Sequence, residues 1–484
     1  MRRLNTIPRQ DAVPAAMAAG LVVFHLLFLL RQACAVLPFP YPVDYREGVT
    51  SFWTLMVHRH LCLYPPVDAG ALIAHNPYTP LIPSLASAVM YAASDPVFLA
   101  GRIVSLASLA AAAACVFAMT RKASALFAMG AVALFLFSPL AARAGMRAHV
   151  DMAGACFSLA GVLAMEKRRP ALSGFFCACA FLTKPLYLWA GLACLIASTR
   201  GRGRTSPVFA AACLSTVAAG IAAGGMPDLC FPEMFRHLVA MNILLFAPRH
   251  FFSVLACVSG THALLLAATL WFLLRHPDRR RALWWYCLVL LPASVCSAKT
   301  GAEDNYYLEL VASGAVCLGL SAQERLPDGR RVFLLLVSVQ MLLYLPVAPA
   351  PTFTRTYGQE IPAAATSSLP GRAQEEEGQL LAEALSAGSG PVLAEDIGFL
   401  LAAGRDVYLE DPYQFSQLAR FGRWDQTPLL ERVKSGFFSL IVLGQESYEK
   451  GSSPYFTEQV VAAVRERYVE SRVIGRYRLL VRRE

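Results

Sequence analysis

Long apolar runs fill residues 1–350 of this chain and are interrupted by short clusters of Arg and Lys. Hydrophobic residues make up 56% of the 484 residues and charged residues only 16%, a composition that excludes an ordinary soluble domain. Runs of about 14 to 24 apolar residues suit helices that cross or enter a membrane. The sequence therefore predicts a mainly α fold, a polytopic membrane helical bundle.

The basic clusters indicate the membrane topology of the bundle. Loops rich in Arg and Lys stay on the cytoplasmic side, so neighbouring clusters must be separated by an even number of spans. Roughly 11 spans satisfy this condition if the Pro-rich stretch 76–93 is interfacial or re-entrant. The alternative is that Lys184-Pro185, between the short runs 171–183 and 185–198, kinks a single span. The clusters are Arg2/Arg3/Arg9, Arg121/Lys122, Lys167/Arg168/Arg169, Arg200/Arg202/Arg204, Arg275/Arg279/Arg280/Arg281 and Arg325/Arg330/Arg331.

The chain divides into a membrane module, residues 1–350, a linker, 351–378, and a C-terminal α/β domain, 379–484. Within the membrane module, residues 31–99 form a first outer loop with interfacial helices. The linker is rich in Pro, Ala, Thr and Ser. One further span, about 332–349, follows the last cytoplasmic cluster, so the odd total of about 11 spans predicts an extracytoplasmic C-terminal domain on a multi-pass protein of the cell inner membrane.

The C-terminal domain shows alternating short strand and helix patterns. Its basic residues are balanced by acidic ones, so we expect no nucleic-acid partner. Strands are predicted at 391–394, 407–409 and 438–443, and helices at 429–434 and 457–468.

Two carboxylates stand close together in the first outer loop. Asp44 and Glu47 follow the first apolar run directly, within one helical turn of each other and after several prolines. Carboxylates are scarce in this half of the chain, so the pair suggests a site. The alternative is a purely structural role, in which the two carboxylates only stabilise the N-terminus of a helix.

Cations gather on the same predicted outer face. Charged groups at membrane depth are costly and usually functional, and cations on the outer side suit an anion such as a lipid phosphate. Acidic residues lie beside them. The cations considered are Arg102, Arg143, Arg147, Lys184 and Lys299, and the further acids are Asp151, Asp304 and Glu309. Arg147 and Asp151 could also be a plain i,i+4 ion pair.

Such an arrangement can hold a phosphate and activate a hydroxyl. A phosphate whose charge is neutralised is a good leaving group, so transfer of a sugar from it requires one base. A glycoside hydrolase requires two carboxylates. His58 and His60 are too weak a signal to predict a metal site, and a divalent metal is left open.

Several motifs together resemble the GT-C superfamily of polytopic membrane glycosyltransferases, which includes protein O-mannosyltransferases and the lipid A aminoarabinose transferase. They are Asp44-Tyr-Arg-Glu47-Gly in the first loop, Asn76-Pro-Tyr-Thr-Pro-Leu, Arg147-Ala-His-Val-Asp151-Met and the segment from Lys299 to Glu309. The resemblance implies a polyprenyl-phosphate-linked sugar donor, extracytoplasmic catalysis, and a lipid, glycan or protein acceptor at the bilayer.

From this resemblance we expect single displacement with Asp44 as the base and Glu47 as the second choice. The competing function is a transporter or lipid flippase of the cell envelope, which should show inverted repeats that are not evident here. The donor phosphate is expected to bind Arg143, Arg147, Lys184 and Lys299, with Asp151, Asp304, Tyr306, Glu309 and Arg102 in support.

Overall fold

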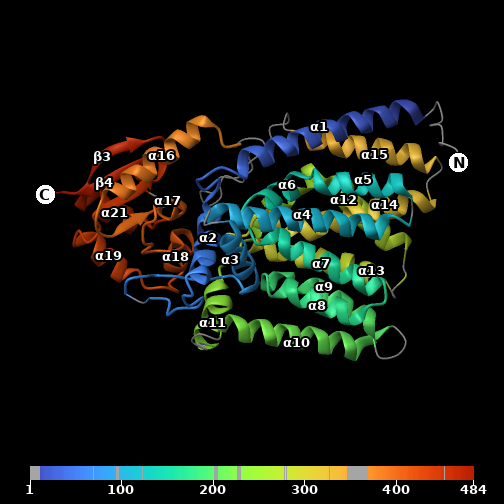
Figure 1. Ribbon diagram of the computed structural model, residues 1–484, viewed down its shortest axis with the longest axis horizontal. Coiled ribbons are helices and arrows are strands. Elements are labelled where there is room, and N and C mark those ends of the chain that lie inside the picture. The colour runs from blue at the N-terminus through green and yellow to red at the C-terminus, as the bar shows by residue number, and fades with distance from the viewer. Residues whose placement is uncertain are drawn as a thin grey trace.

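The computed structural model describes residues 11–483 except 69, 94–96, 123, 201–204, 226–230, 277, 279–280, 326–327, 346–368 and 452. It consists of a helical bundle with a smaller C-terminal domain seated on one end of it (Figure 1). The bundle and its loops contain α1 (Ala12–Val36), α2 (Tyr45–His58), α3 (Leu81–Ala93), α4 (Val97–Thr120), α5 (Ala125–Leu136), α6 (Pro139–Met146), α7 (Asp151–Glu166), α8 (Pro170–Phe181), α9 (Trp189–Thr199), α10 (Thr205–Gly225), α11 (Phe231–Leu238), α12 (Pro248–Arg275), α13 (Ala282–Ala293), α14 (Leu308–Arg325) and α15 (Gly329–Leu343).

Each apolar run predicted from the sequence contains a helix, including the stretch 76–93 that we predicted to be interfacial or re-entrant. Among the described residues, four helices are long and apolar enough to cross a membrane: α1, α4, α12 and the Thr205–Ala223 part of α10. The pair α5 and α6, bent by 66°, adds a fifth if it is one span. Shorter apolar helices make up much of the remaining bundle. The predicted count of about 11 crossings stays a prediction.

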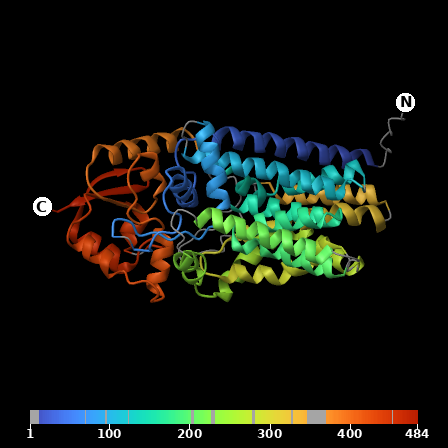
Figure 2. The same ribbon diagram turned by 60° about the horizontal axis from the view of Figure 1, so that its bottom comes forward.

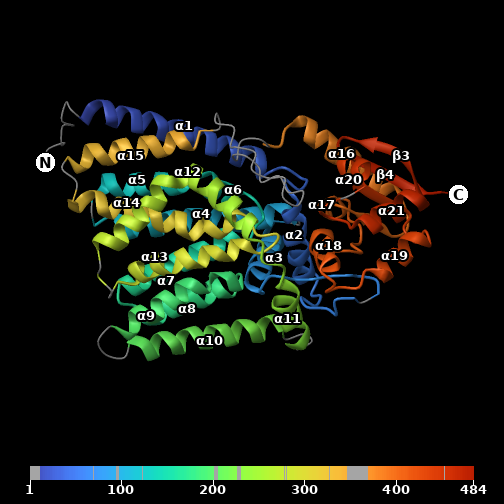
Figure 3. The same ribbon diagram turned by 180° about the vertical axis from the view of Figure 1, so that it is seen from behind.

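The turn at Lys184-Pro185 separates two helices that lie side by side. A short 3₁₀ helix, Pro185–Leu188, follows Lys184 and leads into α9. Both α8 and α9 pack against α7 and α10 (Figures 1 and 3). The structure therefore favours a hairpin over a single kinked span, because the halves of one span would follow each other end to end.

The described residues of the basic clusters lie at helix ends remote from the C-terminal domain. Arg281 Nε lies 3.3 Å from Glu166 Oε2, which joins the start of α13 to the end of α7. Arg330 Nε lies 3.7 Å from Asp11 Oδ2, which joins the starts of α15 and α1. Figures 1 and 3 show these helix ends opposite the C-terminal domain. Residues 2, 3, 9, 202, 204, 279 and 280 lie outside the described residues.

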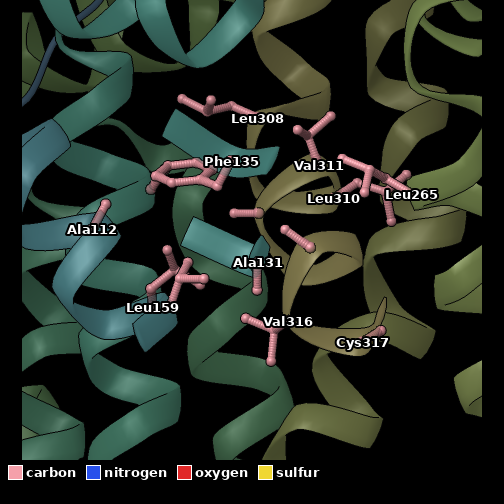
Figure 4. Packing of buried hydrophobic residues seen from close by; sticks show 14 of the residues in the cluster. Ala112, Ala131, Phe135, Leu159, Leu265, Leu308, Leu310, Val311, Val316 and Cys317 are labelled. Atoms are coloured by element: carbon pink, nitrogen blue, oxygen red, sulfur yellow. The ribbon is translucent and has the colours of Figure 1, made fainter. Parts of the chain in front are cut away.

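The bundle core is built from small and branched apolar side chains. Ala112 of α4, Ala131 and Phe135 of α5, Leu159 of α7 and Val311 of α14 are all fully buried (Figure 4). Small residues allow close approach of helices, which supplies packing energy where lipid tails would compete for apolar contacts. This rigid core fixes the helix ends on which the candidate site is built.

The C-terminal domain contains a four-stranded sheet in the order β1-β2-β4-β3. The pair β1 and β2 is parallel, whereas β2–β4 and β3–β4 are antiparallel. The turn between β3 and β4 uses Gly475 at φ +51°, a left-handed conformation that favours glycine. The elements are α16 (Arg372–Ala387), β1 (Val392–Ala394), α17 (Gly398–Ala402), α18 (Pro412–Arg420), α19 (Thr427–Lys434), β2 (Leu440–Gly444), α20 (Gln445–Lys450), α21 (Glu458–Arg467), β3 (Tyr468–Ile474) and β4 (Tyr477–Arg482).

Two sequence predictions for this part need revision. Residues 407–409 do not join the sheet. Leu409 instead forms a parallel β-bridge with Ile73 of the first outer loop, which belongs to the membrane module. Helix α16 begins at Arg372, inside the range predicted as linker, because 372–387 forms an amphipathic helix that buries Leu381 and Leu385. Residues 351–368 of that range lie outside the described residues.

Helix α2 lies between the bundle and the C-terminal domain (Figures 1 and 2). Its Val49 and Trp53 are buried in one apolar cluster with Leu381 and Phe399 of the C-terminal domain. Gly48 is close enough to α17 that an added Cβ would lie 2.7 Å from the Gly398 nitrogen. The C-terminal domain and the first loop thus share a core and form one packed unit.

Candidate active site

The first outer loop ends at the N-terminus of α2, and Asp44 caps that helix. The Asp44 backbone is extended, at φ −147° and ψ 165°, and its Oδ1 accepts a hydrogen bond of 3.1 Å from the Glu47 backbone N–H. Aspartate is a favoured N-cap because its carboxylate satisfies a free N–H of the first turn. The cap fixes the position of the Asp44 carboxylate at the end of the bundle.

Two residues that precede α7 meet the Asp44 carboxylate. Arg147 Nη1 donates to Asp44 Oδ2 at 2.7 Å, and His149 Nε2 lies 3.1 Å from Oδ1. Burial alone would raise the pKa of Asp44, but the charges of His149, Arg147 and Arg46 hold it well below its usual value. The Asp44 side chain keeps 22% of its surface exposed, so it is ionised and within reach of a solute.

Glu47 has a different environment. Its side chain is fully buried and forms two hydrogen bonds with Arg102, of 3.0 Å from Nε and 2.7 Å from Nη2. The backbone N–H groups of Val43 and Ala148 complete its shell, each at 2.8 Å. The Arg102 guanidinium also donates to the carbonyl oxygens of Val36, Phe39 and Tyr41. This buried pair therefore binds the loop to α4 rather than facing solvent.

A second charged group surrounds Asp151 at the start of α7. Lys184 Nζ and the Tyr187 hydroxyl both donate to Asp151 Oδ1 at 3.1 Å. Lys184 also lies over the Tyr306 ring, 5.4 Å from its centroid, as a cation–π contact. Arg147 and Asp151 therefore have separate partners, and the i,i+4 pair considered from the sequence does not form.

The loop 299–304 supplies the third group. Glu303 pairs with Arg46 of α2 at 2.8 Å, and Asp304 pairs with Arg143 of α6. Lys299 Nζ contacts only the Asn242 side-chain oxygen, at 3.3 Å, and has no carboxylate partner among the described residues. Burial and the nearby charge of Lys184 lower the pKa of Lys299 to about 8. Among the described residues, Lys299 thus has no carboxylate at ion-pair distance, and Asp411 acts on its charge only from farther away.

Glu309 stands apart from these groups. Its Oε1 accepts a hydrogen bond of 2.8 Å from the hydroxyl of Tyr286 on α13, and the side chain is buried within the bundle. The structure therefore brings it to neither Asp44 nor the phosphate-binding candidates. Among the described residues, no group of three or more His, Cys, Asp or Glu side chains could hold a metal ion.

The C-terminal domain reaches the same place from the other side. The hydroxyl of Tyr45, the neighbour of Asp44, donates to Asp411 Oδ1 at 2.6 Å. Trp53 Nε1 donates to Glu410 Oε1 at 2.7 Å, and both side chains are fully buried. The first loop is therefore held by the bundle on one side and by this domain on the other.

The arrangement offers two partly exposed carboxylates, Asp44 and the Glu303 that pairs with Arg46, beside several cations. Sequence reasoning identified Asp44, Arg147, Lys184 and Lys299 but assigned no role to Arg46, His149, Tyr45, Glu303 or Asp411. Tyr45 and Arg46 adjoin Asp44, and His149 lies within the Arg147–Asp151 motif, so proximity to the motifs was the signal available. Asp411 carries no such local signal, because its partner is 366 residues away.

Comparison with known proteins gave no match to a family model or to a curated protein. Solved structures do match. ArnT from Cupriavidus metallidurans in the apo state has a TM-score of 0.61 at 12% identity, over 96% of this chain and 98% of ArnT. This chain has the GT-C fold.

Two further structures extend the comparison. The same ArnT bound to undecaprenyl phosphate gives a TM-score of 0.60 at 12% identity, over 95% of this chain and 98% of ArnT. The Archaeoglobus fulgidus oligosaccharyltransferase in the apo form gives 0.48 at 11% identity, over 92% of this chain and 73% of that one. The ArnT matches confirm the fold expected from the first-loop motif and span almost the whole length of both chains.

Proposed function

We propose that this protein is a membrane glycosyltransferase that moves a sugar from a polyprenyl-phosphate carrier to an acceptor hydroxyl. The reaction takes place at the end of the bundle next to the C-terminal domain, on the extracytoplasmic face of the cell inner membrane. Asp44 is the base of a single displacement. The likeness to ArnT, solved with undecaprenyl phosphate, supports the donor class.

The observation that carries this proposal is the environment of Asp44. It is a partly exposed carboxylate, fixed by a helix cap and kept ionised by Arg147 and His149. An ionised carboxylate can accept the proton of an acceptor hydroxyl as that oxygen attacks the sugar. Glu47 cannot take this role without breaking its buried pair with Arg102, so the geometry favours Asp44 of the two acids.

The neighbouring cations stabilise the departing phosphate. Lys299 is best suited to bind it first, because its charge has no carboxylate partner among the described residues. Lys184, whose charge acts on Lys299, extends the same cationic region. Arg143 and Arg147 already pair with Asp304 and Asp44, so they orient carboxylates and add positive potential. Preorganised charge of this kind stabilises the charge that develops on a leaving group.

The test compares Asp44→Asn with Glu47→Gln in purified, monodisperse protein given a polyprenyl-phosphate sugar. Loss of a general base typically costs about 10²–10⁴ in rate, so Asp44→Asn should lose that much turnover while it still binds donor. Asp425→Asn is the matched control, because Asp425 also accepts a backbone N–H, that of Thr427, but at the exposed start of α19. Near-normal transfer by Asp44→Asn would reject Asp44 as the base.

A further inference from the structure

Three tyrosines gather where the first loop meets the C-terminal domain. The ring centroids of Tyr45 and Tyr455 are 4.8 Å apart, and those of Tyr413 and Tyr455 are 6.3 Å apart. Tyr45 adjoins Asp44 on α2, Tyr413 belongs to α18, and Tyr455 precedes α21. We call these three residues the tyrosine cluster. The cluster connects the proposed base, Asp44, with the C-terminal domain, to which the proposed function assigns no role.

Two hydroxyls of the tyrosine cluster are unused. Tyr45 donates to Asp411 and accepts a hydrogen bond of 3.1 Å from the Tyr413 backbone N–H. The Tyr413 and Tyr455 hydroxyls have no hydrogen-bond partner among the described residues, although Tyr413 is only 8% exposed. Neither hydroxyl is among the fully buried polar atoms that lack a partner, so both remain open to solvent or to a solute.

The Tyr413 hydroxyl points at the loop 299–304. A Cβ on Gly301 would lie 3.2 Å from it, and Gly301 itself has a φ of +82°. Glu303, two residues after Gly301, forms an ion pair with Arg46, and the two side chains are 22% and 28% exposed. This side of the cluster therefore combines an aromatic hydroxyl with a partly exposed carboxylate–guanidinium pair.

Asp396 borders the other side. Its Oδ1 accepts a hydrogen bond of 3.0 Å from the Gly398 N–H, whereas its Oδ2 has no partner among the described residues. Gly398 lies against the first loop, since a Cβ on it would be 2.6 Å from Pro42 Cγ. Burial raises the pKa of Tyr455, the charges of Glu395, Asp396 and Glu303 add to that effect, and the charge of Arg476 opposes it.

We propose that the tyrosine cluster, with Asp396 and Glu303, binds a sugar ring of the acceptor. A sugar presents an apolar face of C–H groups and an edge of hydroxyls. Tyrosine rings cover such a face with large, rigid, amphipathic area, while carboxylates and free phenol hydroxyls pair with the edge. The C-terminal domain is then part of the active site, and the acceptor is a glycan or glycolipid.

The position of the cluster favours the acceptor over the donor. This argument rests on the proposed function. A polyprenyl-linked donor is anchored by its chain in the membrane bundle, so its sugar reaches Asp44 from the bundle side. The C-terminal domain, on the far side of the first loop from the bundle, supplies Tyr413 and Tyr455 (Figure 1), although Tyr413 also lies against the loop 299–304 that carries Lys299. A second sugar held there would present its hydroxyl to Asp44.

Saccharide binding is measured by saturation-transfer NMR on the full chain in nanodiscs. The probes are methyl α-D-mannopyranoside, methyl β-D-glucopyranoside, methyl β-D-galactopyranoside and N-acetyl-D-glucosamine. At least one should bind the unmodified protein. Asp396→Asn should weaken that binding by about tenfold, since a hydrogen bond to a charged group is worth that much. Tyr455→Ala should weaken it by a similar factor, because the variant loses the ring that covers the apolar face of the sugar. Tyr413→Phe, which removes only the hydroxyl and keeps the ring, should weaken it less.

Tyr448→Ala is the matched control. Tyr448 is a half-buried tyrosine of the same domain, stacked by Arg465 and Arg478, and its loss should leave saccharide binding unchanged. Failure of all four probes to bind, or equal binding by Tyr455→Ala, Asp396→Asn and the unmodified protein, would overturn the proposal. Saccharide binding is measured without turnover, so the result stands whether or not Asp44 proves to be the base.

A second arm separates the two sugar sources. Farnesyl phosphate mannose, a short donor mimic, is added at saturation to the same NMR sample. If the cluster is the acceptor site, the glycoside signal should persist when the donor mimic is bound. Displacement of the glycoside would show that the cluster holds the donor sugar, and the acceptor assignment would then be wrong.

Discussion

The two acids of the first loop, three residues apart, have opposite environments. Asp44 is the cap and remains 22% exposed, whereas Glu47, one turn into α2, turns inward and is fully buried against Arg102. A buried carboxylate surrounded by four donors is structural, because its charge is already compensated. A motif with two acids can therefore contain one reactive group and one anchor.

Breaking the anchor should cost stability. Arg102→Met would leave Glu47 buried without its cation and would free the carbonyl oxygens of Val36, Phe39 and Tyr41. Removing one partner of a buried ion pair costs roughly 3–5 kcal/mol. We expect a clearly lower unfolding temperature for Arg102→Met and Glu47→Gln in detergent, and little change for Asp44→Asn. Equal stability of all three variants would mean that the pair does not hold the loop.

Lys299 should make donor binding depend on pH. Its pKa of about 8 is low because of burial and Lys184, so the side chain loses its charge as the pH rises through 8. Affinity for a farnesyl phosphodiester, which does not titrate here, should fall by up to about tenfold per pH unit above that value. Lys299→Arg keeps its charge and should bind with little pH dependence.

The same shift affects stability with the opposite sign. The unfolded lysine has a pKa of 10.5, so between about 8 and 10.5 the unfolded chain binds more protons than the folded one. Folding stability from this group therefore rises with pH across that window while donor affinity falls. A fall of both together would assign the pH dependence to another residue.

At the scale of elements, periodicity located the helices well. Each predicted run contains a helix, because an apolar segment in a membrane must satisfy its own backbone. The strand predicted at 407–409 failed for a different reason: Leu409 pairs with Ile73, more than 300 residues earlier. The ion pair between Arg147 and Asp44 could not be predicted from the sequence either, because local spacing suggested Asp151 as the partner of Arg147.

The contact between α2 and α17 can be tested at one glycine. A Cβ on Gly48 would lie 2.7 Å from the Gly398 nitrogen, so Gly48→Ala should push the C-terminal domain away from the first loop. We expect a lower unfolding temperature and reduced transfer. Gly20→Ala is the control, because Gly20 of α1 has nothing within 4 Å and alanine favours a helix by about 1 kcal/mol. Equal behaviour of both variants would exclude a tight contact.

At the scale of the whole molecule, the two ends of the bundle differ in charge and in partners. One end carries the turns rich in Arg and Lys, and the other adjoins the C-terminal domain (Figure 3). The charged groups of the candidate site belong to that second end: Asp44 caps α2, Lys184 pairs with Asp151 at the start of α7, and Lys299 contacts Asn242. Such an asymmetry is what membrane insertion produces, since basic loops stay in the cytoplasm. It also places the proposed donor phosphate site at the end opposite the basic turns, as a reaction on the outer face requires.

This asymmetry predicts the sidedness of the chain in the inner membrane. Alkaline phosphatase joined after residue 484 should be active, because that enzyme folds only outside the cytoplasm. Alkaline phosphatase joined after Lys167, in the turn between α7 and α8, should be inactive, whereas a fluorescent protein joined at the same place should fluoresce. The two junctions lie at opposite ends of the bundle, so they must give opposite results whatever the exact number of crossings. Matching results would mean that α8 and α9 do not form a hairpin across the membrane, and the error would lie at Lys184-Pro185.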